Sequence, residues 1–221
     1  MKIKLKIITL SAAAALALTM SSFAAAAPFT DLLNTSAKEK ILSLQEKGYV
    51  SGVGNGLFAP DTEATAVQSI QLFVNAFDLN LNFVKFAKEP KAADYFSEAD
   101  NDAWYVKALI IAAVNSLELP TDLDINGHWT KEEFTFRLIK AMEKNRQLPM
   151  IKIAPPEIRD QELITVEYTG ALQRALIYGV TALDSDGNFN PKVKISRAQA
   201  AEQVYNALEY LDAHSPKAVI D

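Results

Sequence analysis

The sequence predicts an all-α protein of three helix-loop-helix units, at residues 28–82, 94–146 and 157–213, packed into one compact domain with pseudo-threefold symmetry. Three observations predict this fold. A helix-capping pattern occurs three times at nearly constant spacing, apolar residues recur at the same offsets after each cap, and an amphipathic stretch precedes each cap. One helix pair cannot bury its apolar face alone, so the units are expected to pack against one another.

The second helix of each unit is expected to begin with a capping box. In this pattern a Ser or Thr hydroxyl accepts a hydrogen bond from an early helical amide. A Gln or Glu side chain three residues later accepts one from the amide of the cap. The three caps and their partners are Thr65 with Gln68, Thr130 with Glu133, and Ser196 with Gln199.

Apolar residues follow each cap at offsets eight, nine, eleven and twelve, which lie on one face of a helix. We interpret this face as core. Its members are Phe73, Val74, Ala76 and Phe77 in the first unit, Leu138, Ile139, Ala141 and Met142 in the second, and Val204, Tyr205, Ala207 and Leu208 in the third.

The first helix of each unit is expected at 37–47, 104–114 and 168–178. Gly48 and Gly179 follow two of these stretches as helix-ending glycines, and Ser116 follows the middle one. The outer units then share a Gly-x-Phe-x-Pro loop at 56–60 and 187–191, whereas the middle unit has Leu123 at the Phe position. Prolines in 83–93 and 148–156 mark the connectors between units.

The first residues predict export. Lys2, Lys4 and Lys6 precede an apolar stretch and then small residues, an order typical of a secretory signal peptide at 1–26. Removing these three lysines would change the net charge from −5 to −8, which argues against nucleic acid as a partner. No later stretch is long and apolar enough to predict a membrane span. Because cysteine is absent, any retention at a surface is expected to be noncovalent.

The sequence gives no reason to predict an enzyme, a cofactor or a metal site. His128 and His214 lie far apart and lack metal-ligand spacing, and scattered acidic residues identify no acid–base pair. The segment 184–188 resembles a calcium loop superficially, but it lacks the alternating ligands and the closing glutamate. We therefore predict a turn there.

Together these residues resemble the S-layer homology (SLH) domain, which typically occurs as three tandem motifs. The first unit carries the resemblance best and the middle unit is the most divergent. The matching positions are Phe29, Asp31, Gly48 to Gly52, Gly56, Phe58 and Pro60 in the first unit, Gly179, Gly187, Phe189, Pro191 and Ile195 to Gln199 in the third, and Phe96, Trp104 and Thr130 to Glu133 in the second.

The resemblance implies three motifs around a central helical bundle, with grooves that bind secondary cell-wall polysaccharides, often pyruvylated. It also implies an arginine directly after the cap of the second helix, where a sugar carboxylate would meet it. Only Arg197 retains that arginine, Lys131 is a less directional substitute, and Ala66 has no charge.

The resemblance implies a further aromatic residue early in the first helix, for stacking on a sugar. Only Trp104 provides it, whereas Ser36 and Glu167 occupy the matching positions, and Leu183 replaces the glycine matching Gly52. The expected glycan-binding residues are Arg197, Ser196, Lys131, Thr130, Trp104, Gly48, Gly52 and Gly179. Each has a structural alternative: Arg197 as a solvated first-turn residue, Trp104 as a core anchor, and the glycines as backbone devices.

The sequence therefore predicts a secreted, non-catalytic protein that binds cell-wall polysaccharide and is held noncovalently at the wall or S-layer surface. The loss of the arginine and tryptophan positions in two units each favours an alternative. In that alternative the protein is a structural or adaptor component whose grooves bind another envelope protein.

Overall fold

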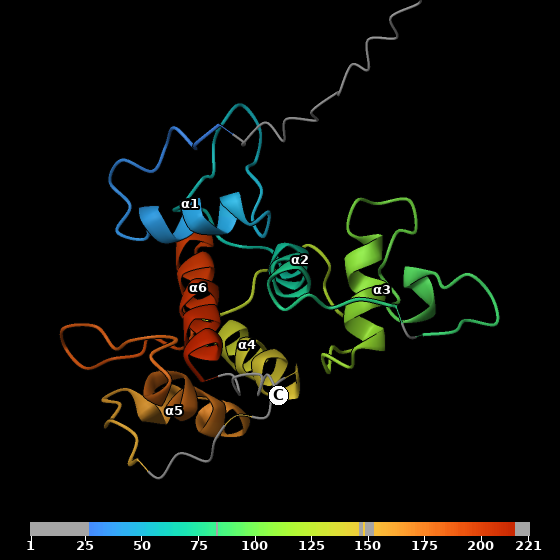
Figure 1. The fold of residues 1–221 in the computed structure, drawn as a ribbon. Helices are drawn as coiled ribbons and strands as arrows, with labels where there is room; N and C mark the ends of the chain where they lie inside the picture. The colour runs from blue at the N-terminus through green and yellow to red at the C-terminus, as the bar shows by residue number, and fades with distance from the viewer. Residues whose placement is uncertain (1–26, 83, 146–147, 149–152, 215–221) are drawn as a thin grey trace, which may run out of the picture.

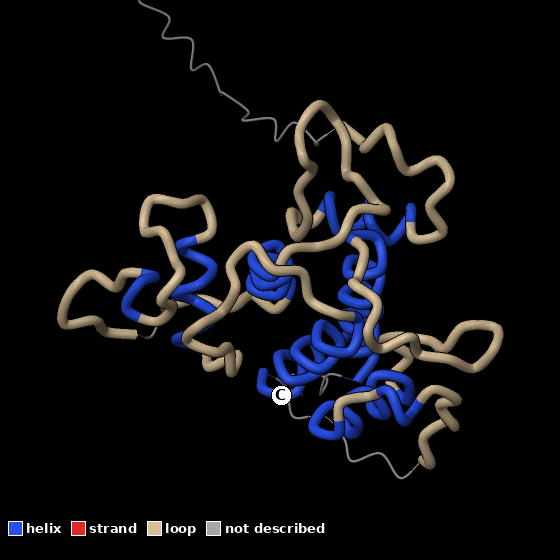
Figure 2. Tube along the Cα trace, turned by 180° about the vertical axis from the view of Figure 1, so that it is seen from behind, coloured by secondary structure: helices blue, strands red, loops and turns tan. Residues whose placement is uncertain are grey.

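The computed structural model describes residues 27–82, 84–145, 148 and 153–214, so the expected signal peptide at 1–26 lies outside the described residues. Within the described ranges the regular structure is helical and contains no strand, which confirms the all-α prediction (Figure 2). The elements are α1 (Lys38–Glu46), α2 (Ala66–Ala76), η1 (Ala92–Asp94), α3 (Val106–Val114), α4 (Lys131–Asn145), η2 (Gln161–Leu163), η3 (Val166–Tyr168), α5 (Thr169–Ile177) and α6 (Arg197–His214).

The inner helices α2, α4 and α6 begin directly after the predicted caps. Thr65 and Gln68 make both hydrogen bonds of the capping box, at 3.3 and 3.2 Å. Ser196 and Gln199 make the same two bonds at 3.2 and 3.1 Å. Thr130 accepts the amide of the third helical residue at 3.3 Å. The caps therefore fix where each inner helix starts.

The outer helices α1, α3 and α5 end alike. The second residue after the end of each helix adopts the left-handed conformation, with φ of 73° at Gly48, 53° at Ser116 and 68° at Gly179. The next amide then donates to a carbonyl five residues back, as from Tyr49 to Leu44 at 2.8 Å. Glycine suits the left-handed conformation because it has no Cβ. In the middle unit Ser116 adopts the same conformation although it carries a side chain.

Helices from different units pack together. Each outer helix packs on one inner helix of another unit: α1 on α6, α3 on α2 and α5 on α4 (Figure 1). The inner helices also contact one another, and their apolar faces form the main core. In the part of the chain that is described, no helix is both long and apolar enough to cross a membrane.

The loops before the inner helices are joined by backbone hydrogen bonds between units. The first amide of each inner helix donates to a loop carbonyl three residues before the cap of another unit. These bonds run from Arg197 to Thr62 at 2.8 Å, from Lys131 to Val193 at 2.8 Å, and from Ala66 to Gly127 at 2.7 Å. Each helix start thus depends on a neighbouring unit for the partners of its free amides.

Candidate functional site

A groove of about 540 Å³ lies beside α2 and takes residues from all three units. The first unit contributes the turn 49–53 and one face of α2. The second unit contributes Trp104, and the third contributes Arg197 and Ala200 at the start of α6. Helix packing explains this convergence, because α3 lies on α2 and α6 starts beside the loop of the first unit.

Arg197 is held against the wall of this groove by its own unit and the first one. Ser196 caps the helix immediately before it. Its Nε donates to the Phe58 carbonyl at 2.8 Å, and its Nη2 donates to the Ser51 carbonyl at 2.9 Å. The guanidinium also lies 4.6 Å from the centroid of the Phe58 ring. Within the described residues Nη1 has no acceptor, so donor capacity remains for a ligand.

The groove has a positive charge that no groove carboxylate balances. Arg197 is the one charged side chain among the described residues that line it. Burial lowers the pKa of Arg197, and the nearby Asp31 carboxylate opposes that effect. The guanidinium stays charged at neutral pH because its ordinary pKa is so high. A groove of this kind favours anions.

Trp104 exposes its ring to solvent and lines the same groove as Arg197. Its side chain is 65% exposed, so the alternative of a core anchor is wrong. The ring makes an edge contact with Tyr105, with centroids 5.7 Å apart. An exposed tryptophan at the rim of a groove offers a flat apolar face for stacking.

Gly52 brings the backbone of the turn close to the groove. A Cβ at this position would lie 2.5 Å from the Leu57 carbonyl oxygen and 2.8 Å from the Phe29 ring. Glycine is therefore required here by packing, as the structural alternative proposed, and it also lies on the groove lining. Gly48 lies just outside, at the helix end described above.

Three other predicted site residues lie at a different interface. Lys131 Nζ lies 4.5 Å from the centroid of the Phe189 ring, which parallels the contact of Arg197. Burial lowers the pKa of Lys131, and the carboxylates of Asp184 and Asp160 oppose that effect. Thr130 caps the same helix, and Gly179 ends α5. The structure thus brings Arg197 and Trp104 together and leaves these three apart.

Sequence reasoning missed the contribution of α2 to the groove. Gln68, Gln71 and Asn75 line it, and Gln71 Nε2 donates to Asn75 Oδ1 at 2.7 Å. Asn75 Nδ2 in turn donates to the Tyr49 carbonyl at 3.4 Å. The available signal was a polar stripe spaced i, i+3 and i+7 in a helix that is otherwise mostly apolar.

The segment 184–188 forms the predicted turn. The Asp184 carboxylate accepts the amides of Asp186 and Asn188 at 2.9 and 2.8 Å. Those backbone bonds, with a bond from Asn190, lower the pKa of Asp184. A search of the described residues finds no cluster of three or more potential metal ligands.

Comparisons with known proteins point to surface layers. The family model of the S-layer homology domain matches residues 28–65 and 164–201, which fall in the first and third units. The predicted middle repeat at 94–146 is not in either match. The chain is also 27% identical, over 202 residues, to a surface-layer 125 kDa protein of Lysinibacillus sphaericus. That alignment covers 88% of this chain and spans 16% of the length of the relative.

The two matched segments include the turn 49–53, the Phe58 loop and the start of α6, which together hold Arg197. Two segments of this chain are similar to the S-layer homology domain, and most of the chain is similar to part of a surface-layer protein.

Proposed function

We propose that this chain binds an acidic cell-wall polysaccharide in the groove beside α2, and that this binding retains the protein noncovalently at the cell envelope. The observation that carries the proposal is that Arg197 and the exposed Trp104 line one groove whose described lining contains no carboxylate. A cation, an open aromatic face and polar amides together suit a charged sugar.

Each group has a chemical task in this proposal. The free donors of Arg197 pair with a sugar carboxylate, such as a pyruvate ketal. Trp104 stacks on the apolar face of a sugar ring. Gln68 and Gln71 hydrogen-bond hydroxyl groups along α2, and the turn at Gly52 allows the backbone to approach the sugar.

The proposal includes a pseudo-threefold relation among three units, with one of three possible grooves complete. The cyclic hydrogen bonds and the shared helix ends support it. By that relation, the groove beside Lys131 has Ser36 at the aromatic position, and the groove beside Ala66 has Glu167 there. Neither combines a cation after the cap with an aromatic ring, so we assign binding to the groove of Arg197.

The comparisons support the cellular setting of this proposal. Similarity to S-layer homology domains and to a surface-layer protein points to a structural, non-enzymatic family at the cell surface. We extend this to a secreted protein whose residues 1–26 direct export. Since the chain spans only 16% of the relative, the assembly and partners of that protein are not transferred here.

Co-sedimentation with purified wall sacculi tests the proposal. Trp104→Ala is the decisive variant because this exposed ring can be removed at little cost to folding, and we expect at least a tenfold loss of binding. Leu33→Ala, which removes a residue that is 84% exposed, is the matched control and is expected to bind normally. Arg197→Ala should also weaken binding, with circular dichroism checking that the loss of its two carbonyl bonds leaves the fold intact.

The same assay separates the alternative of a protein-binding adaptor. Binding that disappears when the secondary polymer is stripped from the sacculi supports the proposal. Unchanged sedimentation with stripped sacculi, together with normal binding by Trp104→Ala, would refute it and favour the adaptor.

A further inference from the structure

A second cavity, of about 510 Å³, lies beside the C-terminal half of α2 and adjoins the groove of Arg197. The two cavities share Tyr49, Gln71 and Asn75 as lining residues. From Gln68 in the first cavity to Asn75, which lines both, α2 advances about 10 Å at the helical rise, and the second cavity continues past the helix end to Asp78. One extended ligand lying along α2 could therefore occupy both.

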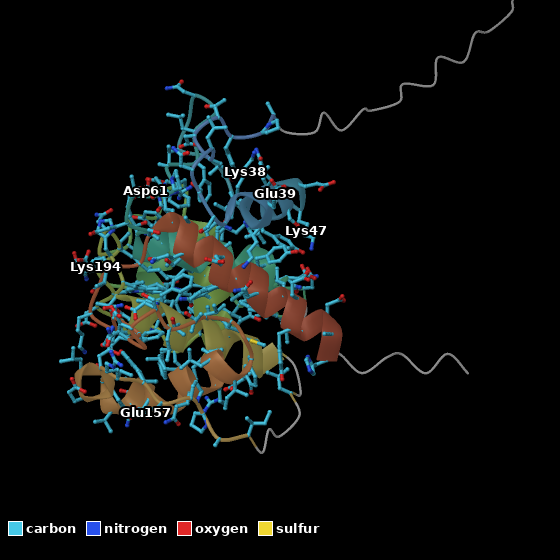
Figure 3. The ribbon with its side chains drawn as sticks, turned by 90° about the vertical axis from the view of Figure 1, so that its left-hand side faces the viewer. Lys38, Glu39, Lys47, Asp61, Glu157 and Lys194 are labelled. Carbon is cyan, nitrogen blue, oxygen red and sulfur yellow. The ribbon has the colours of Figure 1, made fainter. Side chains whose placement is uncertain are left out.

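The walls of the second cavity come from the segment 47–49 after α1, from α2 and the segment 78–82 that follows it, and from α3. Lys47 lies at the end of α1, away from Asp61 and Lys194 (Figure 3). Lys107 lies in the first turn of α3, close in sequence to Trp104 of the first cavity. The two lysines thus extend the positive side of the groove beyond Arg197.

The balance of charge in this cavity favours an anion. Lys47 and Lys107 supply two positive charges, and Asp78 supplies one negative charge. Among the described residues, neither lysine has a carboxylate within ion-pair distance. Both are exposed, so their ammonium groups are solvated and accessible. An unpaired pair of cations facing a shared cavity attracts carboxylate or phosphate groups.

We infer that the second cavity is a further subsite for a later anionic unit of the same polysaccharide, with Lys47 and Lys107 as its cationic contacts. This inference rests on the proposed function, since the ligand enters from the Arg197 and Trp104 groove. The chain would hold an internal stretch of polymer along α2 in addition to the sugar at the tryptophan. Its chemical requirement is a second negative charge one or more sugars away from the first.

Fluorescence-anisotropy titration with a purified wall polysaccharide of measured carboxylate and phosphate content, separated by size into long chains and mono- or disaccharide fragments, tests this inference. The Lys47→Ala/Lys107→Ala variant is expected to bind long chains about three- to tenfold more weakly and short fragments normally. Lys85→Ala/Lys88→Ala removes the same charge from exposed positions outside both cavities and is expected to bind both probes normally.

A variant that removes a negative charge from the cavity provides a second test. Asp78 has φ of 50°, a conformation that asparagine tolerates, so Asp78→Asn removes the acid without straining the backbone. It is expected to bind long chains about twofold more tightly. Unchanged or weaker binding of long chains by Asp78→Asn would count against an anionic occupant.

Treated polymers identify the anion. Disappearance of the lysine effect after carboxyl reduction assigns it to carboxylates, and disappearance after removal of phosphate esters assigns it to phosphate. If the lysine variant still binds long chains more weakly than the parent after both treatments, the inference is overturned.

The two proposals fail differently. If the lysine variant binds long chains normally while Trp104→Ala still loses binding, the second subsite is wrong and the proposed function stands. If Trp104→Ala binds both probes normally, the proposed function is wrong, and the second subsite, which rests on it, is wrong as well.

Discussion

At the scale of single residues, two aspartates hold the loops that lead to the inner helices. Asp31 accepts the amides of Phe58 and Ala59 at 2.9 and 2.7 Å. Asp160 makes the matching pair of bonds to residues 189 and 190, at 2.8 and 2.7 Å. The sequence indicated Asp31 through the family resemblance, but it gave no sign of Asp160, because the spacing to the loop differs between the units.

Asp31 should make stability depend on acid pH. Burial alone would raise the pKa of Asp31, but the bonds from the Phe58 and Ala59 amides bring it below its ordinary 3.8. A carboxyl with a depressed pKa stabilises the folded state above the unfolded pKa and loses that contribution as pH falls through the folded value. Urea unfolding should therefore show Asp31→Asn less stable than the parent at pH 6, with the gap closing below pH 3.

A gap of constant size across that pH range would contradict this role for Asp31. Asp61→Asn removes an exposed acid from the same loop and serves as the control, because its side chain is in solvent.

At the scale of elements, α5 combines two glycines with opposite structural roles. Gly170 lies inside the helix, and a Cβ there would meet only the Arg174 guanidinium, at 3.4 Å. Gly179 follows the helix end with φ of 68°. An alanine suits the first backbone conformation and strains the second.

The two alanine variants should therefore shift stability in opposite directions. Gly170→Ala is expected to raise the free energy of unfolding by about 0.5 kcal/mol, and Gly179→Ala to lower it by about 1 kcal/mol. Thermal unfolding followed by circular dichroism measures both. If both substitutions changed the free energy of unfolding in the same direction, the left-handed conformation of Gly179 would not explain the choice of glycine there.

At the scale of the whole molecule, the sequence predicted the local elements and missed how they assemble. The caps, the helix-ending glycines and the apolar offsets each report on a short stretch of chain, so all six α-helices were found near their true positions. Counting the arginine and the tryptophan unit by unit showed each position lost in two units, but it did not show which groove combines the two that remain. Because Arg197 and Trp104 come from different units, only the three-dimensional structure shows that they line one groove.

The same assembly predicts that single units do not fold alone. α1 packs on α6 and α2 packs on α3, so a fragment of residues 28–82 lacks the main partner of each of its helices. Circular dichroism of that fragment should show little helix, since isolated helices of this length are marginal in water. The intact chain should unfold in one cooperative transition. A stably helical fragment would contradict this interlocked packing.

The groove beside α2 also limits how the number of repeats can change. Deletion of the first unit removes the turn 49–53 and α2 from the groove. Deletion of the second unit removes the Trp104 ring, and deletion of the third removes the Arg197 guanidinium. A chain that lacked any one of the three predicted units would therefore lose part of the lining of this groove. Point substitutions at the matching positions of the other two interfaces leave this one untouched. Substitutions can therefore accumulate unequally along the chain without disturbing this groove, whereas deletion of any one of the three segments disrupts its lining.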